Sequence, residues 1–162
     1  MSDTVLVDAV RTPHGAFLGS LSAVSAVDLG STAVGGLLDR ADVGPAAIDW
    51  VGLGNAIQAA VGQVPARQAA IDGGVSEATP ATTINEASGS GLRSIALAVD
   101  RIEAGRADVA IAGGMESMSQ APHALQGHRE GQRHGDATLL DLMLTDGLVD
   151  QLYDAHMGEL TE

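Results

Sequence analysis

The stretch TTINEASGSGLRSIALAVDRIEAGRADVAIAG, residues 82–113, decides the fold class of this chain. Its first four residues, 82–85, form a short β-branched run, which is typical of a strand. Apolar side chains then recur at helical spacing through residues 90–105, and the run stops at a glycine, as expected of a buried helix. Residues 107–113 (ADVAIAG) indicate another strand. This order predicts two parallel strands joined by a right-handed crossover.

The same alternation of strands and helices fills the chain before this stretch. Residues 4–10 (TVLVDAV) and 49–54 (DWVGLG) predict two further strands, the first of them largely buried. Residues 25–40 carry apolar side chains at helical spacing, with Arg in the last turn. Residues 65–72 begin with Pro and are followed by two glycines, which is typical of a short helix. The whole pattern predicts an α/β layered architecture with a mainly parallel sheet.

The pattern changes after the fourth predicted strand, and this change sets the expected domain organisation. Residues 122–136 are rich in His, Gly, Gln and Arg and show little periodicity, whereas residues 139–148 are apolar again. We therefore expect residues 1–118 to form the α/β domain and residues 119–162 to leave the sheet as a loop region.

Composition bounds the fold and excludes several kinds of chemistry. With 162 residues, 45% of them hydrophobic, the chain can bury one sizeable core. Only 2% of the residues are aromatic and 21 are glycines, so this core is expected to consist of closely packed Ala, Val, Leu and Ile. The sequence contains no cysteine, which excludes disulfides, zinc-thiolate sites and thiol catalysis by this chain.

The charge is strongly acidic and argues against nucleic-acid binding. The formal net charge is −13, and all 8 basic residues are Arg. Such a chain does not favour contact with a phosphate backbone. Two explanations remain: an ordinary soluble acidic enzyme, or adaptation to high salt, where a self-repelling acidic surface is screened. The absence of Lys favours salt adaptation. Without a signal peptide or an apolar run of roughly 18 residues, a cytoplasmic location is expected.

Residues 85–91 (NEASGSG) are the first place to look for chemistry, because ligands of open α/β sheets bind beyond the carboxyl ends of the strands. A serine lies here at a strand-to-helix junction, where unpaired helix amides can stabilise an oxyanion. Alternatively, Ser88 or Ser90 only caps the helix, and spacing alone favours this interpretation. The glycine spacing does not match a dinucleotide-binding motif.

Other motifs carry weaker signals. Residues 113–119 (GGMESMS) follow a strand and are typical of a tight turn whose Met side chains fill gaps. His156 could contact a ligand, although an isolated histidine is more often structural or solvated. His123, His128 and His134 do not have the spacing of a helical metal site, so we predict no metal centre.

Taken in order, these motifs resemble the thiolase family over essentially the whole chain. The matching segments are residues 9–13 (AVRTP), 62–70 (GQVPARQAA), 83–93 (TINEASGSGLR), 113–119 (GGMESMS), 146–148 (DGL) and 156–158 (HMG). The resemblance implies the N-terminal half of a thiolase-like layered fold with part of the loop domain that covers the substrate. The motifs of the C-terminal thiolase domain are not in the sequence, so that domain is expected to be absent. A condensing enzyme of fatty-acid or polyketide synthesis shares the fold, but GGMESMS and HMG argue against it.

The resemblance assigns a catalytic role to Ser88. In the family a Cys normally occupies this position and takes the acyl group from acyl-CoA, while a second Cys and a His from the C-terminal half handle protons. A serine hydroxyl is a far weaker acid than a thiol, and a helix dipole of roughly half a charge cannot ionise it. Ser88 would therefore need a general base from outside the motifs in this chain. Serine-nucleophile thiolases of haloarchaea would fit both this turn and the Lys-free composition.

The resemblance also implies substrates and partners. Leu148, His156 and Met157 would border the pantetheine arm and the acyl group. Coenzyme A thioesters would be substrates, with no bound cofactor. The expected partner is a second copy of the chain or a completing thiolase subunit. The leading interpretation is an acetyl-CoA C-acetyltransferase that is incomplete without a C-terminal half; the alternative is a non-catalytic or truncated thiolase-like module, in which Ser88 only caps its helix.

Overall fold

The centre of the molecule is a three-stranded parallel sheet. The computed structural model describes residues 4–161. Its sheet has the order β2-β1-β3, with β1 at Trp50–Gly54, β2 at Ala81–Ile84 and β3 at Ala110–Gly114. Both neighbours pair with β1 in parallel, which confirms the predicted α/β class and the mainly parallel sheet.

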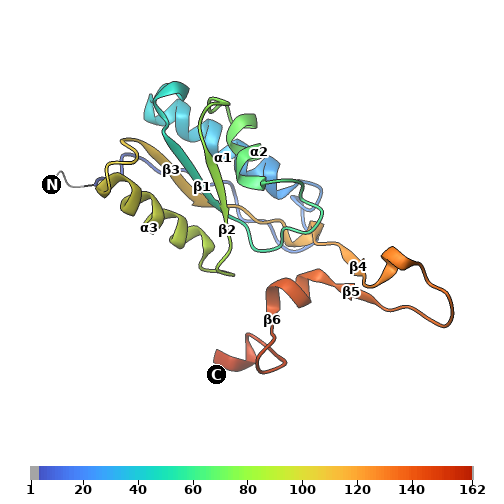
Figure 1. Cartoon of the computed structure of the whole chain (residues 1–162). Helices are drawn as coiled ribbons and strands as arrows, with labels where there is room; N and C mark the ends of the chain where they lie inside the picture. Colours follow the sequence, from blue (N-terminus) through green and yellow to red (C-terminus); the bar gives the residue numbers. More distant parts are fainter. Residues whose placement is uncertain (1–3, 162) are drawn as a thin grey trace.

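Helices cover both faces of the sheet (Figure 1). Helices α1 (Ala26–Ala41) and α2 (Pro65–Asp72) pack together on one face, and α3 (Ser90–Glu103) lies on the other. The chain crosses from β1 to β2 in one direction and from β2 past β1 to β3 in the opposite direction. Right-handed crossovers that reverse direction place their helices on opposite faces, so the strand order explains these layers.

Helix α1 begins at a capping box. Ser25 is the N-cap residue, and Asp28 completes the capping box from the third helical position. Ser25 Oγ accepts from the Asp28 amide at 3.0 Å, and the Asp28 carboxylate accepts from the Ser25 amide at 3.4 Å. Two amides that lack helical partners are satisfied in this way, which fixes the start of α1.

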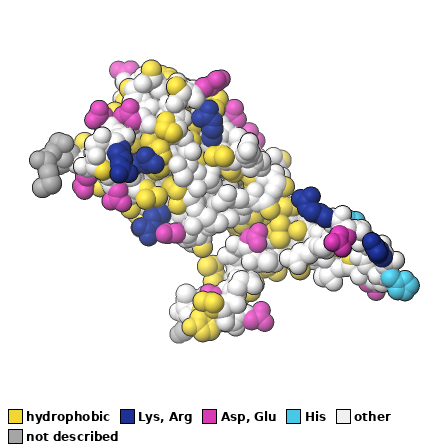
Figure 2. Space-filling view, in the orientation of Figure 1, with side chains coloured by type: hydrophobic (Ala, Val, Ile, Leu, Met, Phe, Trp, Pro, Cys, Tyr) yellow, Lys and Arg dark blue, Asp and Glu magenta, His cyan; other side chains and the backbone are white. Residues whose placement is uncertain are grey.

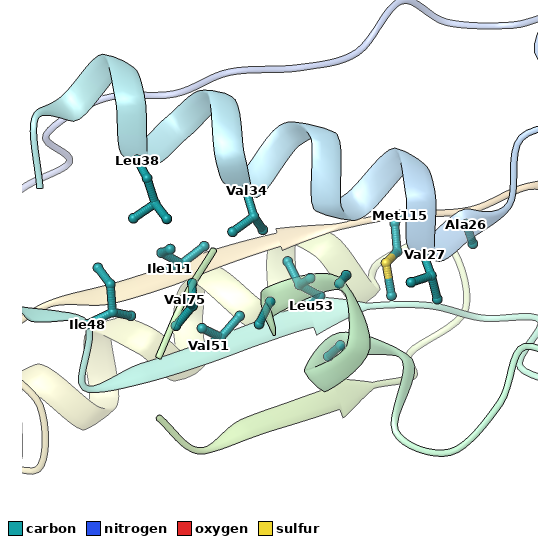
Figure 3. Close-up of a cluster of buried hydrophobic side chains, with 13 residues drawn as sticks. Ala26, Val27, Val34, Leu38, Ile48, Val51, Leu53, Val75, Ile111 and Met115 are labelled. Atoms are coloured by element: carbon teal, nitrogen blue, oxygen red, sulfur yellow. The ribbon is translucent and has the colours of Figure 1, made fainter. Parts of the chain in front are cut away.

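Strand β1 alternates between two cores. Val51 and Leu53 face the larger core, which lies between the sheet and helices α1 and α2 (Figure 3). Trp50 belongs to the smaller cluster on the α3 side, and its ring lies against Gly52. Because side chains of a strand alternate between faces, Gly54 also points toward α3.

The larger core is aliphatic, as the composition predicts. Val34 and Leu38 of α1 point down onto Val51 and Ile111 of the sheet (Figure 3). Burial of each large aliphatic side chain contributes about 1.5–3 kcal/mol. Trp50 is the exception to the small-residue pattern, since it is almost fully buried in the second cluster.

The predicted strand at residues 4–10 is wrong. This segment contains no strand, and Val5, Leu6 and Val7 are 72%, 81% and 75% exposed. Within residues 4–161 no neighbouring strand pairs with it, and a strand forms only where a partner completes its hydrogen bonds. The segment is instead tied to α1 through an ion pair of 2.8 Å between Asp8 and Arg40.

The other predicted elements form: the helix at residues 65–72 has the predicted bounds, and the ends of the others are shifted. The strand expected at residues 107–113 begins at Ala110, because Asp49 Oδ2 accepts from the amides of Asp108 at 2.7 Å and Val109 at 3.0 Å. These amides are therefore satisfied by a side chain and not by a neighbouring strand. The helix expected at 90–105 ends at Glu103.

The remaining segment leaves the sheet as an extended arm (Figure 1). It holds two short antiparallel hairpins, β4–β5 and β6–β7. The bounds are His123–Leu125 for β4, Leu139–Asp141 for β5, Val149–Asp150 for β6 and Ala155–His156 for β7, with a π-helical turn at Leu144–Leu148. Short 3-10 helices lie at Pro45–Ala47, Met118–Gln120, His128–Glu130 and Glu159–Thr161.

Two glycine variants test the contact between α3 and the sheet. A Cβ added to Gly54 would lie 2.6 Å from the Ser90 carbonyl carbon, whereas a Cβ on Gly36 of α1 would meet no atom within 4 Å. We expect Gly54→Ala to lower the free energy of unfolding by about 1–3 kcal/mol. Gly36→Ala should raise it by about 0.5–1 kcal/mol, because alanine favours the helix. Urea denaturation measures both, and an unchanged Gly54→Ala protein would contradict the tight contact.

Candidate active site at the carboxyl edge of the sheet

The three strands end at the same level, so the segments that follow them meet at one edge. Gly54 pairs with Ile84 on one side and with Gly114 on the other. Beyond these pairs, the Met115 amide donates to the Gly54 carbonyl at 2.9 Å, and the Asn55 amide donates to the Ile84 carbonyl at 3.0 Å. This edge is where the sequence predicts the chemistry.

Helix α3 begins directly against this edge. The absence of a side chain at Gly54 lets the Ser90 backbone approach the end of β1. One turn later, Ser94 Oγ lies 2.7 Å from the Gly113 carbonyl oxygen and is completely buried. The first turn of α3 therefore lies against β1, and the second turn is fixed to β3.

The turn between β2 and α3, residues 85–90, is held by its own side chains. The Ala87 amide donates to Asn85 Oδ1 at 3.0 Å, and Ala87 has a left-handed backbone with φ of 48°. Ser90 Oγ accepts from the Glu86 amide at 2.8 Å and donates to the Ala87 carbonyl at 2.6 Å. Alanine seldom adopts this conformation, so these hydrogen bonds stabilise a strained turn.

The two serines of this turn have different environments. Gly89 is the N-cap of α3, and no side chain caps the helix, so the capping interpretation is wrong for both serines. Ser90 is buried, with its hydroxyl in two hydrogen bonds. Ser88 is exposed, and within residues 4–161 its hydroxyl has no hydrogen-bond partner. Ser88 therefore presents a free hydroxyl beside the start of α3.

Ser88 lines a cleft of about 860 Å³. The walls come from the segment after β3, from residues 10–17 and from Gly147 and Leu148 of the arm. The structure therefore brings Ser88 and Leu148, two of the residues predicted for the site, to one cleft.

His156 and Met157 lie next to Leu148 in the arm but do not line the cleft. The Met157 amide donates to the Leu148 carbonyl at 2.9 Å, and His156 pairs with Val149 in the β6–β7 hairpin. The His156 ring is turned to its own chain, where Nδ1 accepts from the Gly158 amide at 3.1 Å. The hairpin thus groups the three predicted substrate residues, with only Leu148 reaching the cleft.

Glu116 is a residue of the cleft that the sequence reasoning missed. Its carboxylate accepts from the Ala56 amide and from Asn55 Nδ2, each at 2.7 Å, and lies 3.4 Å from the Ile57 amide. Partial burial raises the pKa of Glu116, although these hydrogen bonds act in the opposite direction. An acidic residue between two methionines in GGMESMS was the available signal, but its partners lie about sixty positions earlier in the chain.

Glu86 forms an ion pair within the same region. Its Oε1 lies 2.6 Å from Arg93 Nε, and this hydrogen bond raises the pKa of Arg93. Both side chains are about half exposed, so the pair contributes little to stability. The pair does compensate the negative charge of Glu86 beside Ser88.

The described part of the chain contains neither a cluster of metal-binding side chains nor a helix that could span a membrane. No group of three or more His, Asp or Glu side chains among residues 4–161 is arranged to hold a metal ion. Within the same residues no helix has the length and apolar character needed to cross a bilayer.

The sequence of the chain matches one family of enzymes. The family model of the thiolase N-terminal domain matches residues 4–162. The chain belongs to the thiolase family. Its three-stranded sheet with flanking helices is thus the fold of a thiolase N-terminal domain fragment.

Individual relatives agree with this assignment. An acetyl-CoA acetyltransferase of Cupriavidus necator is 47% identical over 162 residues, which are 100% of this thiolase chain and 41% of the relative. An acetyl-CoA acetyltransferase of Allochromatium vinosum is 48% identical over 98% of this chain and 40% of its own length. The cytosolic acetyl-CoA acetyltransferase ERG10 of Gibberella zeae is 46% identical over 94% of this chain and 39% of its own. The chain thus spans about two fifths of the length of these relatives.

Alanine variants of Ser88 and Ser90, the two serines of the turn between β2 and α3, should differ in stability. Ser90→Ala leaves the Glu86 amide and the Ala87 carbonyl without their partner, so we expect a loss of about 1–3 kcal/mol in the free energy of unfolding. Ser88→Ala removes no hydrogen bond and should change stability by less than about 0.5 kcal/mol. Urea denaturation compares the two, and a Ser88→Ala loss as large as that of Ser90→Ala would restore a structural role for Ser88.

Proposed function

We propose that this chain is the N-terminal part of an acetyl-CoA C-acetyltransferase in which Ser88 is the acylated nucleophile. The single observation that carries the proposal is the Ser88 hydroxyl, which has no hydrogen-bond partner among the described residues and lies in a cleft at the start of α3. Membership of the thiolase family supports acyl-CoA as the substrate class. No cofactor is needed for the reaction.

In the proposed reaction Ser88 Oγ attacks the thioester carbonyl of acyl-CoA. The C–S bond breaks, an ester forms on Ser88, and the serine proton passes through a base to the sulfur of the departing CoA. The α-carbon of a second acyl-CoA, after loss of a proton, then takes the acyl group, which gives 3-oxoacyl-CoA and returns the proton to Ser88. The reverse sequence cleaves 3-oxoacyl-CoA with CoA.

The start of α3 would stabilise the charge that develops on the substrate. The first amides of a helix lack intrahelical acceptors and carry partial positive charge, so they favour an oxyanion. They cannot ionise a serine, whose hydroxyl is too weak an acid. We infer that the base for Ser88 comes from the part of a thiolase that the relatives have and this chain does not span.

The proposal assigns roles to the two parts of the chain. Residues 1–118 would form the N-terminal α/β domain of a thiolase, and residues 119–162 would form part of the loop region that covers the substrate. Leu148, His156 and Met157 would border the pantetheine arm and the acyl group. The hairpin contact between Leu148 and Met157 supports a shared role, and the place of Leu148 in the cleft supports contact with substrate.

A second candidate is a thiolase-like module without activity of its own. In that case Ser88 would not be acylated under any condition, which separates the two candidates.

Acylation of Ser88 is the direct test. We expect incubation with acetyl-CoA in high salt to add one acetyl group to the full chain, seen by intact mass spectrometry and located on Ser88 by peptide mapping. Ser88→Ala should abolish the adduct because the attacking oxygen is gone. Ser31→Ala is the matched control, since Ser31 lies in α1 and its hydroxyl donates to the Asp28 carbonyl at 3.0 Å.

Two outcomes would count against the acyl-enzyme. An adduct that persists in Ser88→Ala would place the acetyl group elsewhere and contradict Ser88 as nucleophile. Absence of any adduct, even after a C-terminal thiolase half is supplied in trans, would favour the inactive module.

We also propose that the protein works as an oligomer in the cytoplasm. Helix α3 exposes Leu92 and Ile95 at 74% and 43%, so its outer face suits a second copy or a completing subunit. Hydrophobic side chains also reach the surface elsewhere, among charged ones (Figure 2). A monodisperse monomer in light scattering would argue against the oligomer. The cytosolic relative from Gibberella zeae supports the location.

The acidic, Lys-free surface supports adaptation to high salt, as in the serine-nucleophile thiolases of haloarchaea. At a net charge of −13 the folded chain repels itself, and 1 M salt shortens the screening length to about 3 Å. We expect the free energy of unfolding at pH 7 to rise between 0.1 and 1 M NaCl. The rise should be smaller at pH 5, where the net negative charge of the chain is lower. Equal urea midpoints at the two salt concentrations would leave an ordinary acidic enzyme as the explanation.

A further inference from the structure

A path of hydrogen bonds leads from Glu116 to the turn that presents Ser88. The Glu116 carboxylate accepts from the Ala56 amide at 2.7 Å. The carbonyl of the same residue, Ala56, accepts from Asn85 Nδ2 at 3.1 Å. Asn85 Oδ1 in turn accepts from the Ala87 amide at 3.0 Å, one residue before Ser88. The segments after β1, β2 and β3 are thereby joined in one network.

The strained end of this path is Ala87. Its φ of 48° lies in the left-handed region, which alanine adopts only when the surroundings hold it there. Asn85 supplies the acceptor for the Ala87 amide and is itself anchored to Ala56. Release of Asn85 would therefore let the backbone before Ser88 relax and move the hydroxyl relative to the amides of α3.

The other end of the path is fixed by Glu116. The carboxylate also accepts from Asn55 Nδ2 at 2.7 Å, while Asn55 Oδ1 is buried and has no partner among the described residues. Both oxygens of Glu116 therefore face N–H donors, and a half-buried carboxylate without them would be costly. Glu116 thus holds the segment after β1 in a position where the Ala56 carbonyl accepts from Asn85 Nδ2.

We propose that Asn85 and Glu116 are positioning residues for acyl transfer, which set the orientation of Ser88 through Ala56. This inference rests on the proposed function, since it concerns the nucleophile of that reaction. Neither side chain touches the reacting atoms in this scheme. Their effect is to keep the nucleophile at the positive end of α3.

A single engineered thiol measures this orientation without any acyl-CoA. The chain contains no cysteine, so Ser88→Cys introduces the only thiol, and alkylation by iodoacetamide from pH 5.5 to 9 reports its pKa. A thiol held at a helix N-terminus ionises below the ordinary value of about 8.5. We expect Asn85→Ala in this background to move the profile toward that value and to slow alkylation at pH 7 by about threefold or more.

Three further variants in the same background sharpen the test. Glu116→Ala should shift the profile in the same direction as Asn85→Ala. Glu116→Gln should keep most of the parent profile, because its amide oxygen accepts from Ala56 and its amide nitrogen can donate to a rotated Asn55. Gln58→Ala is the matched control: Gln58 Nε2 donates to the Asn55 carbonyl at 2.9 Å in the same segment but does not contact Asn85.

The outcomes separate positioning from general stability and from the function itself. Urea denaturation of each variant shows whether it is folded, and exposed Asn85 keeps the test decisive if Glu116→Ala unfolds. A shift in Asn85→Ala with an unchanged Gln58→Ala supports the proposal. An Asn85→Ala profile identical to that of the parent overturns it. Because the thiol readout needs no substrate, a failure of Ser88 acylation would refute the proposed function without altering this result.

Discussion

The close approach of α3 to the ends of the strands is the constraint on which the rest of the structure depends. The Ser90 backbone can lie against β1 because Gly54 has no side chain, and Ser94 fixes the next turn to β3. If this contact opened, the start of the helix would no longer face the cleft. The alternation in β1 serves the same end, because Val51 and Leu53 fill the core beneath α1 while Gly52 and Gly54 leave room on the α3 side.

For the proposed serine nucleophile, geometry and acidity are separate requirements, and the proposal rests on the first. Ser88 is exposed in the cleft and precedes the first residue of α3 by two positions, which would suit attack with charge stabilisation by the helix amides. A thiol in that position would ionise in part through the helix alone, whereas a hydroxyl would not. The ion pair of Glu86 with Arg93 compensates a nearby carboxylate, so in the proposed reaction Glu86 would not oppose charge development at the thioester.

The sequence predicted most of the fold because its helices and the three strands of its sheet carry local signals. Periodicity located α1 and α3, the proline and glycines at its ends located α2, and short β-branched or apolar runs located β1, β2 and β3. The strand at residues 4–10 was wrong because a ladder depends on a partner that local pattern does not reveal. Ser88 came from a motif, but Glu116 was missed because its partners, Asn55 and Ala56, are distant in sequence. Periodicity describes one element at a time, so contacts between strand ends lay beyond it.

The position of Trp50 makes tryptophan fluorescence a probe of only one face of the sheet. It is the sole tryptophan, it is almost fully buried on the α3 side of β1, and the Arg101 guanidinium lies 4.7 Å from its ring centre. Emission from this indole therefore reports whether α3 is docked on the sheet and is insensitive to the packing of α1 and α2. If α3 separated from the sheet, the emission maximum of Trp50 would shift to longer wavelength. Loosening of α1 and α2 on the opposite face would leave the emission maximum unchanged.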